Sequence, residues 1–182
     1  MRYKAIRFGI QSLAAVVLIA FAGASISACG QPRAEAPGPQ TPPPDLKGDP
    51  FLDTLQARTF GYFWELTDNE TGLTPDRAPN LTFSSIAAVG FALTAYGIGV
   101  ERGYVTRDAA SERTLNTLRH FWELPQGADT AAVAGYHGFF YHFLRFDTGC
   151  RYSNSELSTI DTALLLAGVL FSQEYFDRRD ST

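Results

Sequence analysis

The sequence predicts an all-α fold built from αα-hairpins, and three observations support this prediction. Four segments carry helical periodicity or helix-capping signals, and two of these segments are apolar on nearly every side. The segments also follow the same order twice along the chain. Of the 182 residues, 24 are Phe, Trp or Tyr, which is enough for a large core or a ring-stacking surface and excludes disorder.

Residues 1–28 are expected to be a bacterial lipoprotein signal peptide. A basic start is followed by an apolar run, residues 13–22, that is too short for a stable membrane-spanning helix. The sequence Ile-Ser-Ala-Cys at residues 26–29 looks like a lipobox, in which the Cys29 thiol is alkylated by diacylglycerol and becomes the new N-terminus. An ordinary secretory signal is the alternative. Gly30 after the cysteine, in place of Asp, resembles the outer-membrane sorting pattern, so we expect an outer-membrane lipoprotein that faces the periplasm or the cell surface.

Residues 29–48 are expected to be a linker, because the segment is rich in proline and has no aromatic residue. It would hold a globular part, residues 49–182, away from the membrane. With Cys29 acylated, Cys150 has no partner for an intrachain disulfide. Cys150 has no nearby base in the sequence either, and a structural role is favoured over a nucleophilic one.

The charge balance excludes one class of partner. Cutting after residue 28 removes three basic residues and no acidic one, which leaves 12 basic and 19 acidic residues and a net charge of −7. An acidic chain without a basic run does not bind nucleic acid through phosphates. Only Lys4 and Lys47 are lysines, so the chain has no polybasic membrane patch either.

The first and third helices are expected to be amphipathic. The first begins at Asp49-Pro50, an N-cap followed by proline at the first helical position, and runs to about Thr67. The third begins at Thr106, a good N-cap, and ends at Leu124-Pro125. Such helices are half exposed.

The second and fourth helices are expected to be buried on most sides. The second spans residues 84–102 and is stopped by Gly103, and the fourth runs from about Ser158 to the charged segment 177–180. Both are apolar nearly all round. If these helices are part of a ring of helices that this chain does not complete, the side of the fourth helix at residues 164–170 would be exposed.

The repeat predicts how these helices are arranged. Phe-Trp-Glu-Leu ends both the first helix (residues 63–66) and the third (121–124), and a turn and then a buried helix follow each. Alternating half-exposed and buried helices suggest two concentric layers, an (α/α) toroid whose loops at one end surround a cleft. A linear solenoid is the alternative, but it gives no reason for the long aromatic loops. Before the fourth helix, residues 139–146 and 150–152 are expected to form a small β-hairpin that turns at Gly149.

Two acids mark the candidate catalytic site. Aligning the two repeats puts Asp161 where the first repeat has Ala87, at the start of a buried helix. Glu156 lies five residues earlier, so both acids can face one cleft, as glycoside hydrolysis requires. The alternative is that Asp161 completes a capping box with Ser158, and for Asp161 alone both interpretations stay open.

Further residues are candidates for binding sugar. In the loop at residues 136–143, Tyr136, His137 and Tyr141 could stack on sugar rings, while Phe139 or Phe140 and Phe143 are expected in the core. Asp76 and Arg77 could orient hydroxyl groups, although a local loop pair is slightly favoured. The three histidines lack any metal-binding spacing, so no metal site is expected.

Four motifs in order resemble the bacterial glycoamylase-like domain family, which includes endo-β-1,2-glucanases and the processing domain of cyclic β-1,2-glucan synthases. They are the segments at residues 71–77, 84–91, 138–144 and 156–165. The resemblance implies an (α/α)6 toroid, no cofactor, a β-1,2-glucan or related β-glucan substrate and an inverting mechanism. It also places Arg151 with the candidate substrate-binding residues, and Glu156 and Asp161 with the cleft acids.

Two departures from the family pattern matter. The segment at residues 150–155 lacks the tryptophan expected there. The chain also supplies two hairpins of six, so residues 49–182 are expected to be the N-terminal part of a truncated domain, with the general acid beyond Thr182. A non-catalytic carbohydrate-binding lipoprotein and an inactive truncated product are the alternatives to an enzyme.

Overall fold

The computed structural model describes residues 48–79, 81–129 and 131–177. By its internal contacts the chain divides into two compact units, Met1–Asp53 and Thr54–Thr182. The described helices and strands belong to the second unit, except for the first few residues of the first helix. The expected signal peptide, the lipidated Cys29 and nearly all of the linker lie outside the described residues.

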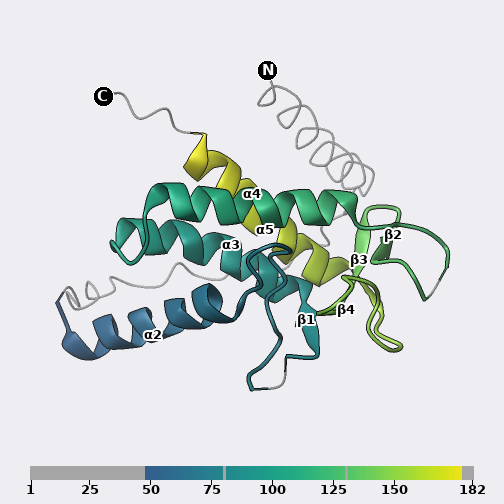
Figure 1. The fold of residues 1–182 in the computed structure, drawn as a ribbon, viewed down its shortest axis with the longest axis horizontal. Helices are drawn as coiled ribbons and strands as arrows, with labels where there is room; N and C mark the ends of the chain where they lie inside the picture. The colour runs from purple at the N-terminus through teal and green to yellow at the C-terminus, as the bar shows by residue number, and fades with distance from the viewer. Residues whose placement is uncertain (1–47, 80, 130, 178–182) are drawn as a thin grey trace, which may run out of the picture. The chain divides into compact units, whose positions relative to one another are not determined.

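Most of the described chain is helical, as expected, and Figure 1 shows its four α-helices with short strands gathered at one end of α3 and α5. Each helix agrees with its predicted position to within about two residues, the usual uncertainty of a helix end. The helices are α2 (Pro50–Leu66), α3 (Ile86–Glu101), α4 (Arg107–Glu123) and α5 (Thr159–Phe176).

The helix starts show why these segments fold where they do. Asp49 accepts a hydrogen bond from the backbone N–H of Phe51 at 2.8 Å, and Thr106 accepts one from Ala109 at 3.2 Å. These caps satisfy N–H groups that have no partner within the helix. The second helix begins later than expected, at Ile86, because Ser84 and Ser85 are extended in a strand.

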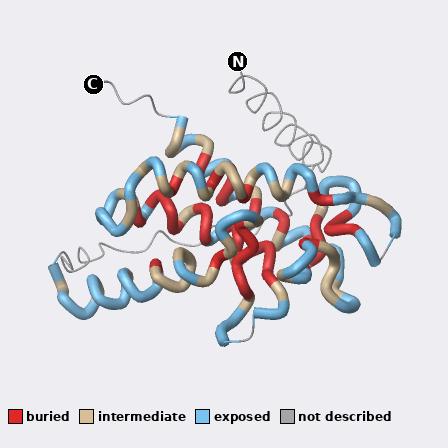
Figure 2. The backbone as a smooth tube through the Cα atoms, in the orientation of Figure 1, coloured by how far each residue is buried: buried red, intermediate tan, exposed pale blue. Residues whose placement is uncertain are grey.

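The two apolar helices α3 and α5 pack closely together; α3 is buried as predicted, whereas only five of the eighteen residues of α5 are buried, so its predicted burial on most sides is wrong. Ten of the sixteen residues of α3 are buried, and Figure 2 shows this burial continuing into the segments around its start. The helices approach closely at two glycines: a Cβ added at Gly90 would lie 2.3 Å from the carbonyl oxygen of Leu164, and one at Gly168 would lie 2.3 Å from that of Gly90. Close packing of this kind requires residues without side chains.

The amphipathic helices α2 and α4 pack around this pair. The ring of Trp64 on α2 meets that of Tyr96 on α3 edge to face, with 5.6 Å between the centroids. From α4, the guanidinium of Arg113 lies over the Trp64 ring at 3.6 Å. The outer faces stay exposed, as the sequence predicted, whereas Tyr96 is fully buried.

Five short strands form two small antiparallel sheets among the described residues, where the expected all-α fold included only one small β-hairpin before the fourth helix. One sheet pairs β1 with β4, and the other has the order β2-β3-β5. The strands are β1 (Phe83–Ser85), β2 (Gly135–Tyr136), β3 (Phe139–Tyr141), β4 (Phe143–Arg145) and β5 (Leu157–Ser158).

The expected β-hairpin is correct only in part. The chain does turn at Gly149, which has a positive φ of 68° and donates its N–H to Arg145 at 2.9 Å. A single bridge, between Leu144 and Arg151, joins the two arms. Backbone hydrogen bonds from Arg145 to Cys150 at 2.7 Å and from Tyr152 to Phe143 at 2.9 Å flank this bridge, while β4 also pairs with β1 and β3 pairs with β2 and β5.

The sequence repeat has a structural counterpart. Strand β1 runs directly into α3, and strand β5 runs directly into α5. The expected exposed flank of the fourth helix is also present, since Leu164 and Leu170 are 37% and 53% exposed. The mostly helical fold is therefore confirmed, and the closed toroid stays a prediction.

Candidate functional site

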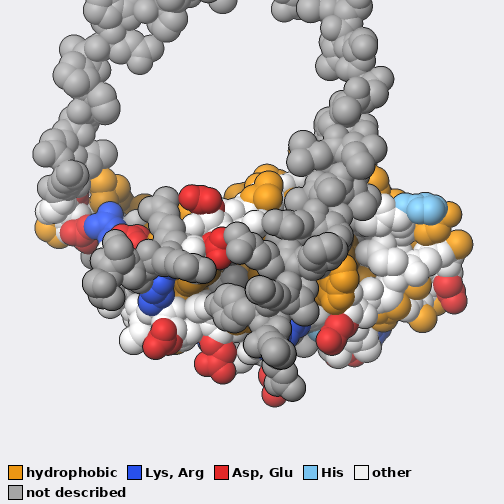
Figure 3. All heavy atoms as spheres, turned by 90° about the horizontal axis from the view of Figure 1, so that it is seen from above, with side chains coloured by type: hydrophobic (Ala, Val, Ile, Leu, Met, Phe, Trp, Pro, Cys, Tyr) orange, Lys and Arg blue, Asp and Glu red, His pale blue; other side chains and the backbone are white. Residues whose placement is uncertain are grey.

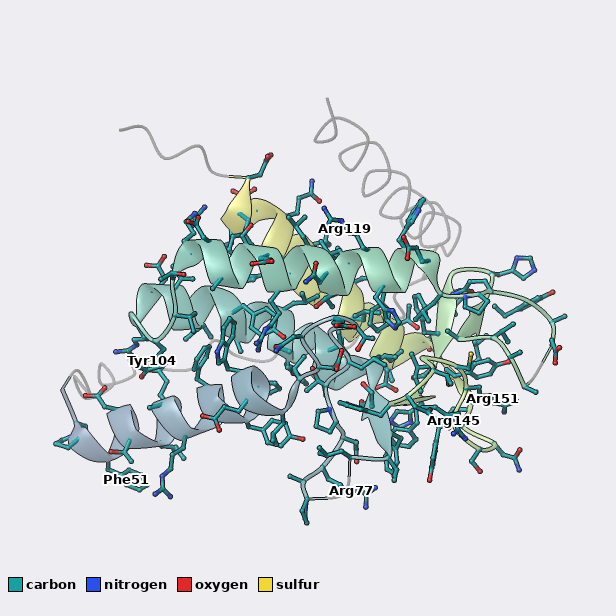
Figure 4. The ribbon with its side chains drawn as sticks, viewed as in Figure 1. Phe51, Arg77, Tyr104, Arg119, Arg145 and Arg151 are labelled. Atoms are coloured by element: carbon teal, nitrogen blue, oxygen red, sulfur yellow. The ribbon has the colours of Figure 1, made fainter. Side chains whose placement is uncertain are left out.

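The candidate residues gather where β1 and β5 enter the two apolar helices. Figure 4 places Arg145 and Arg151 on loops at this end, with Tyr104 at the opposite end of the helices. Most residues of the short strands are buried, and exposed positions such as Tyr136, Arg145 and Leu157 lie at strand ends. This is the end of the bundle at which the sequence predicted a site.

The backbone of His142 links the starts of α3 and α5. Its carbonyl accepts a hydrogen bond from the N–H of Ile86, the first residue of α3, at 3.2 Å. Its own N–H donates to the carbonyl of Glu156, just before β5, at 2.9 Å. Because both bonds are made by the main chain, the position of His142 is fixed relative to both helices.

The side chain of His142 lies between the two candidate acids. Nδ1 is 2.8 Å from Oε1 of Glu156, and Nε2 is 3.8 Å from Oδ2 of Asp161. The Glu156 side chain is 68% exposed and that of Asp161 only 13%. Hydrogen bonds to the Glu156 carboxylate, from its own backbone amide and then from His142, lower its pKa and keep it ionised.

The capping role of Asp161 is also present. The Ser158 hydroxyl accepts a hydrogen bond from the Asp161 N–H at 3.2 Å and lies 2.5 Å from Oδ2 of the Asp161 carboxylate. Ser158 is thus the N-cap of α5, and its hydroxyl orients the Asp161 side chain. Capping leaves the other carboxylate oxygen of Asp161 without a bond to Ser158, so the cap and a role toward substrate are compatible.

Two of the expected substrate-binding residues are brought together next to the acids. The guanidinium of Arg151 lies over the ring of Tyr141, 4.4 Å from its centroid. Its Nε donates to the carbonyl of Ser155 at 2.7 Å, which anchors the segment immediately before Glu156. Tyr141 itself is buried and pairs with Leu157 of β5. Arg151 is therefore the more accessible partner.

Asp76 and Arg77 form the local pair that the sequence favoured, with Arg77 Nε 3.1 Å from Asp76 Oδ2. The pair still belongs to the same region as the acids, because Arg77 lies over the ring of Phe83 at 5.1 Å. That ring packs on Phe143 at 4.9 Å, and Phe143 stacks on His142 at 3.8 Å. A chain of rings thus connects the first loop with His142.

Tyr136 and His137 lie farther from the acids. Their rings meet edge to face at 4.0 Å, and both side chains are exposed at the turn between β2 and β3. Strand β3 separates β2 from β5 in the sheet, so this pair and the acids lie toward opposite edges. Phe140 is buried, as expected, and Phe143 is half buried.

Comparisons with known proteins agree on one group of relatives. An exo-β-1,2-glucooligosaccharide sophorohydrolase of Parabacteroides distasonis is 28% identical over 141 residues, which are 74% of this chain and 18% of the relative. The crystal structure of a protein from Bacteroides uniformis, described provisionally as a glucoamylase, is similar with a TM-score of 0.61 and 28% identity over 72% of this chain and 32% of that one. No family model matches the chain.

Two further crystal structures extend the comparison. A β-1,2-glucanase from Parabacteroides distasonis gives a TM-score of 0.61 and 25% identity over 71% of this chain and 18% of that one. An endo-β-1,2-glucanase from Chitinophaga pinensis, solved with sophorotriose and glucose, gives a TM-score of 0.61 and 21% identity over 73% of this chain and 32% of that one. At that identity it supports the fold alone. The resemblance to the glycoamylase-like family is thereby confirmed. The chain spans about a fifth to a third of the length of these relatives.

The sequence did not identify His142 as a site residue. It was considered only as a metal ligand, for which its spacing from the other histidines is wrong. The position of His142 was the available signal. It stands between β3 and β4, directly after the buried Tyr141, and successive side chains of an extended chain point to opposite faces, so the His142 side chain points away from the core. Its pairing with Glu156 depends on strand register, which the sequence does not specify.

Charges on the described surface are mostly acidic. Figure 3 shows acidic side chains spread more widely than basic ones over one face, with hydrophobic side chains between them. Among residues 48–79, 81–129 and 131–177, no group of three or more His, Cys, Asp or Glu is placed to hold a metal ion. In the same part of the chain, no helix combines the length and apolarity needed to cross a membrane.

Proposed function

We propose that the chain is part of a glycoside hydrolase that acts on β-1,2-glucan or a related β-glucan. The observation that carries this proposal is the position of Glu156 and Asp161 on either side of His142, with both acids at the start of α5. Relatives named as β-1,2-glucan hydrolases support the choice of substrate class. The absence of basic patches fits an uncharged substrate.

The proposed chemistry is acid–base hydrolysis with inversion. One carboxyl group protonates the departing oxygen, and another activates water on the opposite face of the sugar. Glu156 is ionised and exposed, which suits a group that binds substrate or accepts a proton from water. Asp161 is more enclosed and is the better placed of the two to keep a fixed orientation.

In this proposal the helices form part of an (α/α)6 toroid. The inner layer would contain α3 and α5, and the outer layer α2 and α4. The close contact of the inner helices at Gly90 supports such a layer, and so do the TM-scores near 0.6. Leu164 and Leu170 would then face further inner helices.

Substrate would be held by polar groups and rings around the acids. Arg151 with Tyr141, and Asp76 with Arg77, are the proposed hydrogen-bonding groups, because ring contacts connect both pairs to the region of His142 and Glu156. Tyr136 and His137, at the other edge of the sheet, would contact more distant sugar units. Exposed rings with polar tips suit both stacking and hydrogen bonding to sugar hydroxyls.

We also propose that Cys29 is lipidated and that the protein is anchored to the outer membrane. The lipobox-like residues 26–29 and the proline-rich residues after them support this. The test is mass spectrometry of the mature protein from bacterial membranes. A diacylglyceryl group on Cys29 is expected, and a Cys29→Ser variant should lose it together with membrane fractionation. An unmodified mature N-terminus elsewhere would contradict the anchor.

Activity is tested with linear β-1,2-glucan and the full-length hydrolase of which the chain is proposed to be a part. Shortened products are expected, and product anomers seen early by NMR should be inverted. Glu156→Gln and Asp161→Asn should each lower turnover by at least about tenfold. Asp147→Asn is the matched control, because this exposed carboxylate pairs with Arg145 on the neighbouring turn. Binding without shortening would favour the non-catalytic carbohydrate-binding alternative.

A further inference from the structure

The two ring nitrogens of His142 lie at different distances from the two acids, and this difference determines which nitrogen carries the proton. Nδ1 of His142 is within hydrogen-bond distance of Glu156, whereas Nε2 faces Asp161 at 3.8 Å. A neutral imidazole has one N–H and one lone pair, and a carboxylate can only accept. The bond to ionised Glu156 therefore places the N–H at Nδ1 and leaves the lone pair of Nε2 toward Asp161.

No other charge faces the ring from the elements that pack against it. Strand β1 and the start of α3 approach it with Ser85 and Ile86, which do not titrate, and Phe143 covers one ring face. Glu156 comes from the segment before β5, and Asp161 from the first turn of α5. Within the described residues, the carboxyl groups placed against the two ring nitrogens are those of Glu156 and Asp161.

We propose that His142 is a positioning residue that exchanges a proton with Asp161 through Nε2, while Glu156 fixes the orientation of its ring. This inference rests on the hydrolase function proposed above. In the exchange, Asp161 first takes a proton from the attacking water, and the O–H bond of its carboxyl then breaks as an N–H bond forms at Nε2. The products are a carboxylate and an imidazolium, which remain paired. The separation is longer than a hydrogen bond, as is common in sites without substrate.

The backbone explains why the ring can serve this purpose. Because the N–H and C=O of His142 are bonded to Glu156 and to Ile86, the ring is held where both apolar helices begin. The Ser158 hydroxyl contacts Oδ2 of Asp161, the same oxygen that faces Nε2 of His142. A proton passed between Asp161 and His142 therefore moves between two groups whose positions are independently fixed.

The first test does not depend on activity. The full chain is labelled with ¹⁵N-histidine, and the His142 signals are assigned by their loss in His142→Asn. The neutral ring is expected to carry its proton at Nδ1. Glu156→Gln should shift the ring toward the Nε2-protonated tautomer, whereas Asp147→Asn should leave it unchanged. An Nε2-protonated ring in the unsubstituted chain would overturn the inference.

The second test measures hydrolysis of β-1,2-glucan. In His142→Asn the side-chain amide nitrogen takes the place of Nδ1, and in His142→Gln it takes the place of Nε2. Neither amide can accept the exchanged proton, because an amide is not basic. Both variants should lose at least about tenfold in kcat with KM within about twofold. The double variant His142→Asn with Asp161→Asn should be no slower than Asp161→Asn alone, because the two groups act as one unit.

The outcomes separate the inference from the function on which it rests. Full kcat in His142→Asn, or additive losses in the double variant, would overturn the proton exchange. An unsubstituted full-length protein that leaves the glucan intact would overturn the hydrolase function. If the tautomer test then gave the expected result, the orientation of the His142 ring by Glu156 would be supported, and its role in hydrolysis would be overturned.

Discussion

Gly90 and Gly168 bring the backbones of the two apolar helices into contact: a Cβ on Gly168 would lie 2.3 Å from the carbonyl oxygen of Gly90 and 2.8 Å from its Cα. The atoms that such a Cβ would meet belong to the main chain, so no side-chain rotation can relieve the clash. The contact sets how near α3 and α5 lie, and hence how near Ile86 and Asp161 at their starts come to His142.

Gly90→Ala should therefore destabilise the protein by about 1–3 kcal/mol, because the helices must move apart. Gly61→Ala is the matched control, since a Cβ there meets nothing nearer than 3.6 Å and alanine favours a helix by about 0.5–1 kcal/mol. Urea unfolding measures both. Equal stability of the two variants would contradict the close contact.

Arg113 connects α4 with the end of α2. Its guanidinium lies over the Trp64 ring, and it donates hydrogen bonds to the Trp64 carbonyl and to Asn69. Arg113→Lys keeps the charge but loses the planar fork, so we expect a loss of about 1–2 kcal/mol in the free energy of unfolding.

The control for Arg113 lies on the same helix. Arg119 is exposed and points away from the other helices in Figure 4, so Arg119→Lys should change stability by less than about 0.5 kcal/mol. Thermal or urea unfolding of the two variants gives the comparison. Similar losses at both positions would show that the stack on Trp64 contributes nothing specific.

Much of this fold could be predicted because local signals determine it. Thr106 and Asp49 mark helix starts through their own side chains, and the unbroken apolarity of α3 requires burial whatever surrounds it. Strands β1, β2 and β5 were missed because they are two or three residues long and are held by partners outside their own segment: β1 pairs with β4, sixty residues later. Such pairing leaves no periodic pattern in the sequence.

In the candidate site, too, some residues could be predicted from local sequence and one could not. Glu156 and Asp161 could be found because a comparison of two repeats shows an acid where the other has alanine. His142 could not, since its role comes from the register that sets Tyr141 against Leu157 and thereby turns the next side chain toward Glu156. Register is fixed by the packing of the whole sheet rather than by a local motif.

Stability should fall in mild acid because of His120. Burial lowers the pKa of this histidine, although Asp68 and Glu123 partly oppose the shift, and its buried Nε2 has no hydrogen-bond partner within the described residues. The unfolded chain binds a proton at the ordinary histidine pKa, so the stabilising effect is present above that value. It is lost as the pH falls toward the lowered pKa of the folded state.

His120→Gln should remove part of this pH dependence between about pH 7.5 and about pH 5. The measurement is the urea midpoint at several pH values, and His137→Gln is the control because that side chain is exposed on a turn. An identical acid-dependent loss in the unsubstituted chain and in His120→Gln would exclude His120 as its source.

The cap of α5 can be separated from the site by comparing two similar caps. Ser158 and Thr106 each accept a hydrogen bond at 3.2 Å from the N–H three residues later, so Ser158→Ala and Thr106→Ala should each cost about 0.5–2 kcal/mol. Only Ser158 also contacts the carboxylate of Asp161. Binding of a β-1,2-glucan oligosaccharide, measured by calorimetry, should therefore weaken in Ser158→Ala and stay unchanged in Thr106→Ala. Equal binding by both variants would mean that the Ser158 hydroxyl serves the helix alone.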